Sequence, residues 1–158
     1  SSPVVAPPLP PGFNVHLVRE VDGHRMYRGG APRGDTFKAL VGAARARGLA
    51  LTFIDLRHPP STDDESGKGG RLTPATEKKT AASEKTAYVS VSALDKALLQ
   101  YIDQALARGD VYIHCMYGVN RTGFAVARYA TGRKLKLDRT GMGERDWAQG
   151  EAFEKAQR

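Results

Sequence analysis

The sequence is poor in cysteine, with one in 158 residues, and has only four histidines. A single cysteine excludes a disulfide bond within the chain, and no group of cysteines and histidines has the spacing of a zinc site. No apolar run is long enough to span a bilayer, so we expect no membrane-spanning helix. Internal repeats are also absent. An apolar share of 41% is typical of a globular protein.

Acidic residues are outnumbered by basic ones, 17 against 24, which gives a net charge of +7. A basic balance indicates an anionic partner, although a solvated basic surface would explain it equally well. No helix-turn-helix, zinc or aromatic RNA-binding pattern accompanies the charge, so we do not expect nucleic acid as the partner. A polyphosphorylated small molecule suits the charge. The sequence gives no indication of the oligomeric state.

The length suits one domain with a sizeable core. Residues 1–12 contain five prolines and are predicted to form an extended arm, and residues 13–158 form the domain. The chain begins with Ser1 and Ser2 and no methionine, which favours a processed form. Export to the periplasm or the exterior after signal removal and a cytoplasmic location are both compatible with this start.

Short β-branched runs alternate with helical patterns along the domain. Strands are predicted near residues 13–21, 25–28, 51–56, 88–91 and 111–113, and helices near 35–47, 74–85, 94–108, 124–129 and 138–158. This alternation predicts a single α/β domain with a mainly parallel sheet and helices on both faces. The polar, glycine-rich residues 58–71 are predicted to be a mobile loop at the rim of the site.

The segment from Val111 to Gly123 concentrates the chemistry. It reads as a buried strand, a tight loop and the start of a helix, with Cys115 in the loop and Arg121 six positions later. A loop that leads into a helix N-terminus binds anions readily, and nearby cations together with that helix end favour a reactive thiolate. The segment therefore predicts a nucleophilic cysteine beneath a bound phosphate. In the purely structural alternative, Cys115 is a small buried apolar residue and Arg121 is a surface charge.

Each residue type around Cys115 has a chemical use. Arg121 can hold two phosphate oxygens with its planar fork, and Gly118 lets the loop backbone turn inward. The hydroxyl of Thr122 can donate to the sulfur, and His114 can orient the loop and support the thiolate. The other loop residues predicted to surround the phosphate are Met116, Tyr117, Val119 and Asn120.

The pattern from His114 and Cys115 through five residues to Arg121 and Thr122 resembles the phosphate-binding loop of the protein tyrosine phosphatase superfamily. Residues 27–32 are similar to the entry segment of the small atypical and dual-specificity phosphatases. Residues 54–57 resemble the Ile-Asp-Leu-Arg strand end of those enzymes and of the cysteine phytases. The resemblance covers about residues 27–133. It implies the protein tyrosine phosphatase fold and a cysteinyl-phosphate intermediate, with no metal or organic cofactor.

The sequence departs from the family pattern at the general acid. These enzymes usually carry an aspartate on a loop well before the cysteine, but residues 88–94 contain none. Asp95 follows at the start of the predicted helix and is one candidate, although it also suits the helix dipole there. Asp63 and Asp64, on the glycine-rich loop, are the others.

The substrate favoured by the charge and the resemblance is an inositol polyphosphate, as for the cysteine phytases. Residues predicted to contact it besides the loop are Arg57, His58, Lys68 and Arg71. The chain is shorter than typical cysteine phytases, and its loop lacks their usual small residues. A protein tyrosine or dual-specificity phosphatase that acts on phosphoproteins therefore stays open. A third alternative, from another class, is a pseudophosphatase scaffold that binds phosphate without turnover.

Overall fold

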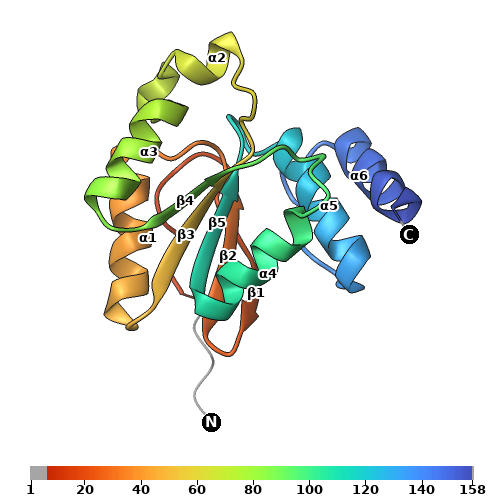
Figure 1. The fold of residues 1–158 in the computed structure, drawn as a ribbon, viewed down its shortest axis with the longest axis horizontal. Coiled ribbons are helices and arrows are strands. Elements are labelled where there is room, and N and C mark those ends of the chain that lie inside the picture. Colours follow the sequence, from red (N-terminus) through yellow and green to blue (C-terminus); the bar gives the residue numbers. More distant parts are fainter. Residues whose placement is uncertain (1–6, 158) are drawn as a thin grey trace.

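The computed structural model describes residues 7–157. They contain a five-stranded sheet between two layers of helices (Figure 1). The strands are β1 (His16–Val21), β2 (His24–Gly29), β3 (Ala50–Asp55), β4 (Ala87–Ser90) and β5 (Gly109–His114). Their order is β1-β2-β5-β3-β4, in which β1 and β2 form an antiparallel hairpin and the other neighbours pair in parallel. The predicted α/β class with a mainly parallel sheet is confirmed.

The helices of the described residues are α1 (Gly34–Ala46), α2 (Thr62–Glu65), the 3-10 helix η1 (Lys68–Gly70), α3 (Pro74–Ser83), α4 (Leu98–Arg108), α5 (Arg121–Arg133) and α6 (Glu144–Ala156). Helices α1 and α3 cover one face of the sheet, and α4 and α5 cover the other, with α6 packed against α5 (Figure 1). Of the predicted arm, residues 1–6 lie outside the described residues, and residues 7–12 form no helix or strand.

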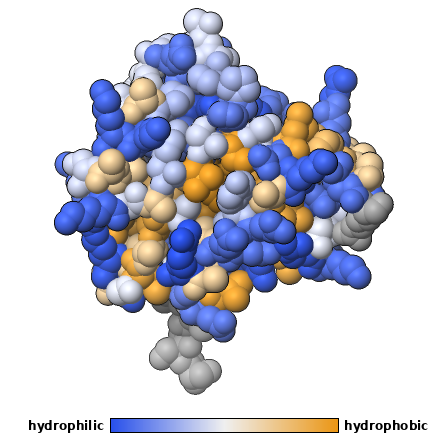
Figure 2. Space-filling view, viewed as in Figure 1, coloured by the Kyte–Doolittle hydropathy of each residue, from blue (hydrophilic) through white to orange (hydrophobic). Residues whose placement is uncertain are grey.

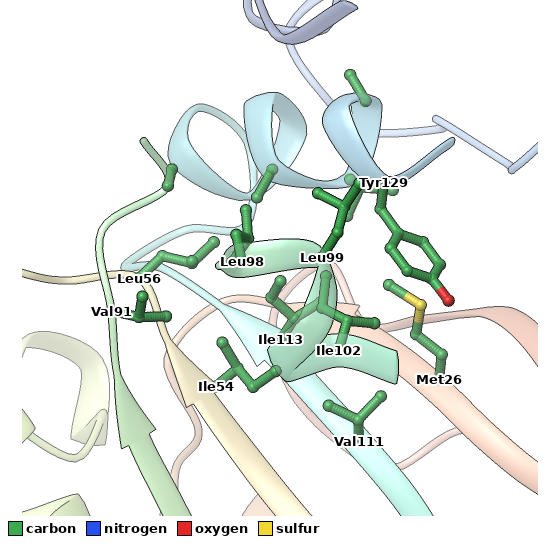
Figure 3. Close-up of a cluster of buried hydrophobic side chains, with 14 of the residues drawn as sticks. Met26, Ile54, Leu56, Val91, Leu98, Leu99, Ile102, Val111, Ile113 and Tyr129 are labelled. Atoms are coloured by element: carbon green, nitrogen blue, oxygen red, sulfur yellow. The ribbon is translucent and has the colours of Figure 1, made fainter. Parts of the chain in front are cut away.

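Strand β5 lies at the centre of the sheet, and all six of its residues are buried. Val111 and Ile113 point into the cluster under α4 and α5, together with residues of β2, β3 and the two helices (Figure 3). Tyr112, between them, points to the opposite face and joins Phe37 and Phe53, whose rings stack at 4.3 Å. Burial on both faces fixes β5 in register and so fixes the position of the loop that follows it.

Helix α4 begins at Leu98, four residues later than predicted. The carboxylate of Asp95 accepts a hydrogen bond from the amide of Ala97, and Arg128 binds the carbonyls of Ala93 and Asp95. These hydrogen bonds satisfy backbone groups of residues 93–97 in a conformation other than a helix, so the helix starts after them. Leu94, the first residue of the predicted helix, is consequently 57% exposed.

The loop predicted at residues 58–71 contains two short helices, α2 and η1, so it is more ordered than expected. Ser61 caps α2 in a reciprocal arrangement: its side chain accepts from the amide of Asp64, and the Asp64 carboxylate accepts from the amide of Ser61. This capping box supplies local hydrogen bonds that composition alone does not reveal.

Charged and polar side chains dominate the face seen in Figure 2, and apolar ones gather near its centre. Among the described residues, no helix combines the length and the apolar character needed to cross a lipid bilayer.

Candidate active site

The site lies at the carboxyl ends of the central parallel strands. Strand β5 ends at His114 and is followed by Cys115, the loop of residues 116–120, and α5. Strand β3, its parallel neighbour, ends beside it at Asp55. In an open parallel sheet this edge is where ligands bind, because the connecting loops converge there.

Cys115 is 2% exposed, and its sulfur accepts two hydrogen bonds. The amide of Gly118 donates to Sγ at 3.3 Å, and the hydroxyl of Thr122 donates at 3.0 Å. Both donors stabilise a negative sulfur, since a hydrogen bond to the charged form of a group favours that form. The contact predicted between Thr122 and the sulfur is therefore present.

The loop carbonyls are held from outside the loop. Met116 accepts from the amide of Ala31 at 2.9 Å, Gly118 from the side chain of Asn14 at 3.2 Å, and Val119 from the amide of Gly143 at 3.3 Å. The carbonyl and the N–H of one trans peptide point in opposite directions. The amides that follow these carbonyls are thus turned toward the inside of the loop, as a phosphate-binding loop requires.

Gly118 is the residue that allows this turn. Its φ is +75°, in the left-handed region, and a Cβ added there would lie 2.5 Å from the carbonyl carbon of Gly29. Any other residue would meet both backbone strain and a clash with β2.

Arg121 forms a two-pronged ion pair with Asp64. Its Nη1 and Nη2 each donate to one carboxylate oxygen, both at 2.9 Å. The Asp64 side chain is fully buried, whereas that of Arg121 is 35% exposed. Because Asp64 contacts the two terminal nitrogens, the Nε edge of the guanidinium stays available for phosphate oxygens.

Asp64 is held as a carboxylate in this arrangement. Burial would raise the pKa of Asp64, but the hydrogen bonds from Arg121 and from the amide of Ser61 outweigh burial and lower it. Both oxygens of this group already accept hydrogen bonds. The geometry therefore favours a role in orienting Arg121 over the predicted alternative role as proton donor.

A cluster of buried charges lies behind the loop and comprises Asp55, Arg57, Glu77 and His114, all with fully buried side chains. Arg57 donates to both Asp55 oxygens, at 2.9 and 3.1 Å, and to Glu77 at 2.8 Å. His114 contacts Glu77 at 2.8 Å. Arg57, predicted to contact substrate, is thus engaged in the protein interior.

Three groups of this buried charge cluster, from Asp55, Glu77 and His114, lie within 4.8 Å of one another, a spacing at which they could hold a metal ion. The guanidinium of Arg57 already donates to both carboxylates, and both nitrogens of His114 have hydrogen-bond partners. The donor set is therefore neutralised and occupied by the protein itself, and we assign no metal ligand there.

A cleft of about 390 Å³ opens beside Arg121. Its other polar lining residues are His58, Ser92, Asn120 and Asp146, and its apolar wall consists of Leu56, Pro59, Ala93, Leu94 and Phe124. The side-chain NH₂ of Asn120 donates to the carboxylate of Asp146 at 2.8 Å. Asp95, by contrast, does not line this cleft, and its carboxylate is engaged with the amide of Ala97.

Of the remaining predicted rim residues, Arg71 lies beside the loop. The guanidinium of Arg71 packs over the rings of Tyr117 and Phe13, 5.0 and 5.3 Å from their centroids. Its Nε is buried without a hydrogen-bond acceptor among the described residues. Lys68 is exposed, and its carbonyl accepts from Arg71 at 3.2 Å.

Sequence reasoning missed Asn14, Glu77 and Asp146 as members of the site. Each reaches it from an element remote in sequence, and none has a spacing that marks it. Glu77 stands in the first turn of a lysine-rich helix, where an acidic residue usually complements the helix dipole.

No protein-family model matches this sequence, and no curated protein matches it in sequence. Among solved structures, a candidate phosphatase (DUF442) from Shewanella putrefaciens CN-32 superposes with a TM-score of 0.61 at 15% identity, over 90% of this chain and 93% of that one. The core catalytic domain of the PP-IP phosphatase Siw14 from S. cerevisiae superposes with a TM-score of 0.60 at 17% identity, over 95% of this chain and 91% of that one. PTPMT1 in complex with PI(5)P superposes with a TM-score of 0.52 at 15% identity, over 89% of this chain and 96% of that one. The chain thus has the fold of these protein tyrosine phosphatase-like proteins, and the resemblance seen in the sequence is confirmed at the level of the fold.

Proposed function

We propose that this protein is a cysteine-dependent phosphatase that hydrolyses phosphomonoesters through a cysteinyl-phosphate on Cys115. The observation that supports this most is the sulfur at the centre of the inward-turned loop, with donors from Gly118 and Thr122 at 3.3 and 3.0 Å. Arg121 stands at the start of α5 with its Nε edge available. Nucleophile, anion site and cation thus meet in one loop, which is the arrangement that phosphoryl transfer to a thiolate requires.

In the first step, the thiolate attacks phosphorus, and the S–P bond forms as the P–O bond to the alcohol or phenol breaks. Arg121 and the loop amides bind the equatorial oxygens, on which charge must be stabilised. In the second step, water attacks phosphorus, loses a proton and displaces the sulfur. The hydroxyl of Thr122, already directed at Sγ, stabilises the thiolate as it leaves.

The departing oxygen of the first step needs a proton. Within the described residues, His58 and Asp146 are the side chains besides Arg121 that line the cleft and carry an ionisable group. Asp63, Asp64 and Asp95 do not line this cleft. We therefore favour His58 or Asp146 as the donor over these three sequence-based candidates.

We favour inositol polyphosphates as substrates. The net charge of +7 suits a polyanion. Arg71 lies beside the loop residue Tyr117, so its guanidinium is close enough to the loop to serve a second phosphate. Siw14, of similar fold, is an inositol pyrophosphate phosphatase.

A second candidate substrate is phosphotyrosine in proteins. The wall of the cleft beside Arg121 is largely apolar, with Leu56, Leu94 and Phe124 among its residues. Such a wall can pack against an aromatic leaving group, whereas a polyphosphorylated ring would find little charge there.

The test is phosphate release from inositol hexakisphosphate and from a phosphotyrosine peptide, measured side by side. Cys115→Ser serves as the control and should abolish release from both. Strong release from the inositol phosphate supports the favoured substrate, and preference for the peptide supports the second. Tight binding of both without release would overturn the enzymatic proposal in favour of a phosphate-binding scaffold.

A further inference from the structure

Glu77 is a fully buried acid that reaches the end of β5 from α3. Its Oε2 lies 2.8 Å from Nε2 of His114, the residue directly before Cys115. Its Oε1 accepts from Arg57, also at 2.8 Å. Burying a charge is costly unless the charge is paired, so the role of Glu77 is to be sought in its two partners.

The hydrogen bonds of His114 indicate the charge of its ring. Nδ1 lies 3.0 Å from the carbonyl oxygen of Cys115, and Nε2 faces the carboxylate of Glu77. A carbonyl and a carboxylate only accept, so each ring nitrogen must donate. A histidine that donates from both nitrogens is an imidazolium. Burial raises the pKa of Glu77 above its usual value, and the ring of His114 and the guanidinium of Arg57 on the other oxygen oppose that shift. With two cationic donors on its two oxygens, we take Glu77 as the carboxylate and place the proton on the ring.

The charge balance of the buried cluster agrees with this. Asp55 and Glu77 contribute two negative charges and Arg57 one positive charge, so a positive His114 makes the cluster neutral. The other titratable groups nearby do not alter this balance. Tyr88 donates to Asp55 at 2.6 Å, and the ring of Tyr112 stacks on that of His114 at 5.4 Å.

We propose that Glu77 is a positioning residue that holds His114 as an imidazolium and thereby stabilises the thiolate of Cys115. The electrostatics support it: burial alone would lower the pKa of His114, but Glu77 and Asp55 outweigh burial and raise the pKa above its usual value. Glu77 acts through His114 and does not itself touch the phosphate loop. The inference rests on the proposed function, but its test needs no turnover.

Glu77→Gln is the sharpest variant, because the network can remain satisfied. The glutamine carbonyl can accept from Arg57 while its NH₂ donates to a neutral His114, and the cluster stays neutral without either charge. Since Cys115 is the only cysteine in the chain, its thiolate absorbance in the ultraviolet can be titrated against pH, with Cys115→Ser as the blank. We expect the midpoint of this thiolate titration to rise by about one pH unit in Glu77→Gln, which is the low end of the shift that loss of a nearby charge produces.

Glu84→Gln is the matched control, since it removes an exposed acid adjoining the same helix and should leave the midpoint unchanged. In a His114→Asn background, Glu77→Gln should cause no further rise. An unchanged midpoint in folded Glu77→Gln, or an equal rise without His114, would overturn the proposal. If Glu77→Gln does not fold, nitrogen NMR of the His114 ring in the wild-type protein tests the proposal instead. A neutral His114 ring at neutral pH would contradict the proposal. Failure of the proposed function would appear differently, as absent turnover with the thiolate shift intact.

Discussion

Asp64→Asn tests how Arg121, the proposed phosphate-binding residue, is held. In the wild type, two charge-assisted hydrogen bonds of 2.9 Å join the Asp64 carboxylate to Arg121. Asparagine keeps one acceptor oxygen but turns an NH₂ group toward the guanidinium, so one bond and the ionic attraction are lost. A hydrogen bond to a charged group contributes about 1.5–3 kcal/mol.

The expected loss of activity follows from the partial exposure of the pair. The Arg121 side chain is 35% exposed, so solvent screening puts the effect at the low end of that range. With about 1.4 kcal/mol for each factor of ten, kcat/KM should fall roughly ten- to thirtyfold. Asp63→Asn is the control, since Asp63 is the exposed neighbour of Asp64 and makes no contact with Arg121.

The assay compares kcat/KM over a range of pH for p-nitrophenyl phosphate and for an alkyl phosphate, whose leaving group needs a proton more. A residue that orients Arg121 should affect both substrates equally at every pH. If Asp64→Asn instead impairs only the alkyl phosphate and removes the alkaline limb of the profile, then Asp64 is the proton donor. Wild-type activity would refute the orienting role altogether.

Three further predictions follow from the site and the core. Gly118→Ala should abolish phosphate binding, measured by vanadate inhibition, because its Cβ would lie 2.5 Å from backbone of Gly29; wild-type inhibition would contradict the loop geometry. Either His58→Gln or Asp146→Asn should remove the alkaline limb of the kcat/KM profile against pH for an alkyl phosphate. An unchanged pH profile in both variants would show that the proton comes from another group. Burial would raise the pKa of Asp55, but His114 and Arg57 outweigh burial and lower it. The stabilisation by Asp55 is therefore present above its unfolded pKa of about 3.9 and lost as pH falls through the lower folded value, so Tm should decline there; a flat Tm down to pH 2 would refute this.

The fold and the loop around Cys115 could be predicted because their signals are local. Strand, loop and helix follow one another within residues 109–133, and the apolar run of β5 marks a strand buried on both faces. The spacing of Cys115, Gly118, Arg121 and Thr122 then fixes which groups can meet around the sulfur.

The partners of that loop could not be predicted, because they come from residues far away in the chain. Asp64 lies 57 positions from Arg121, and Glu77 lies 37 from His114. Nothing in the sequence around Asp64 or Glu77 distinguishes them from solvated acids on polar segments. The late start of α4 escaped prediction for a related reason, since it depends on Arg128 binding carbonyls more than 30 residues away.

The measurement that tests the central proposal most directly is mass spectrometry of the protein quenched during turnover of p-nitrophenyl phosphate. We expect one phosphoryl group on the peptide that contains Cys115, and none on the same peptide of Cys115→Ser. Release of phosphate by the wild type without a phosphoryl group on Cys115, or equal release by Cys115→Ser, would contradict the cysteinyl-phosphate mechanism.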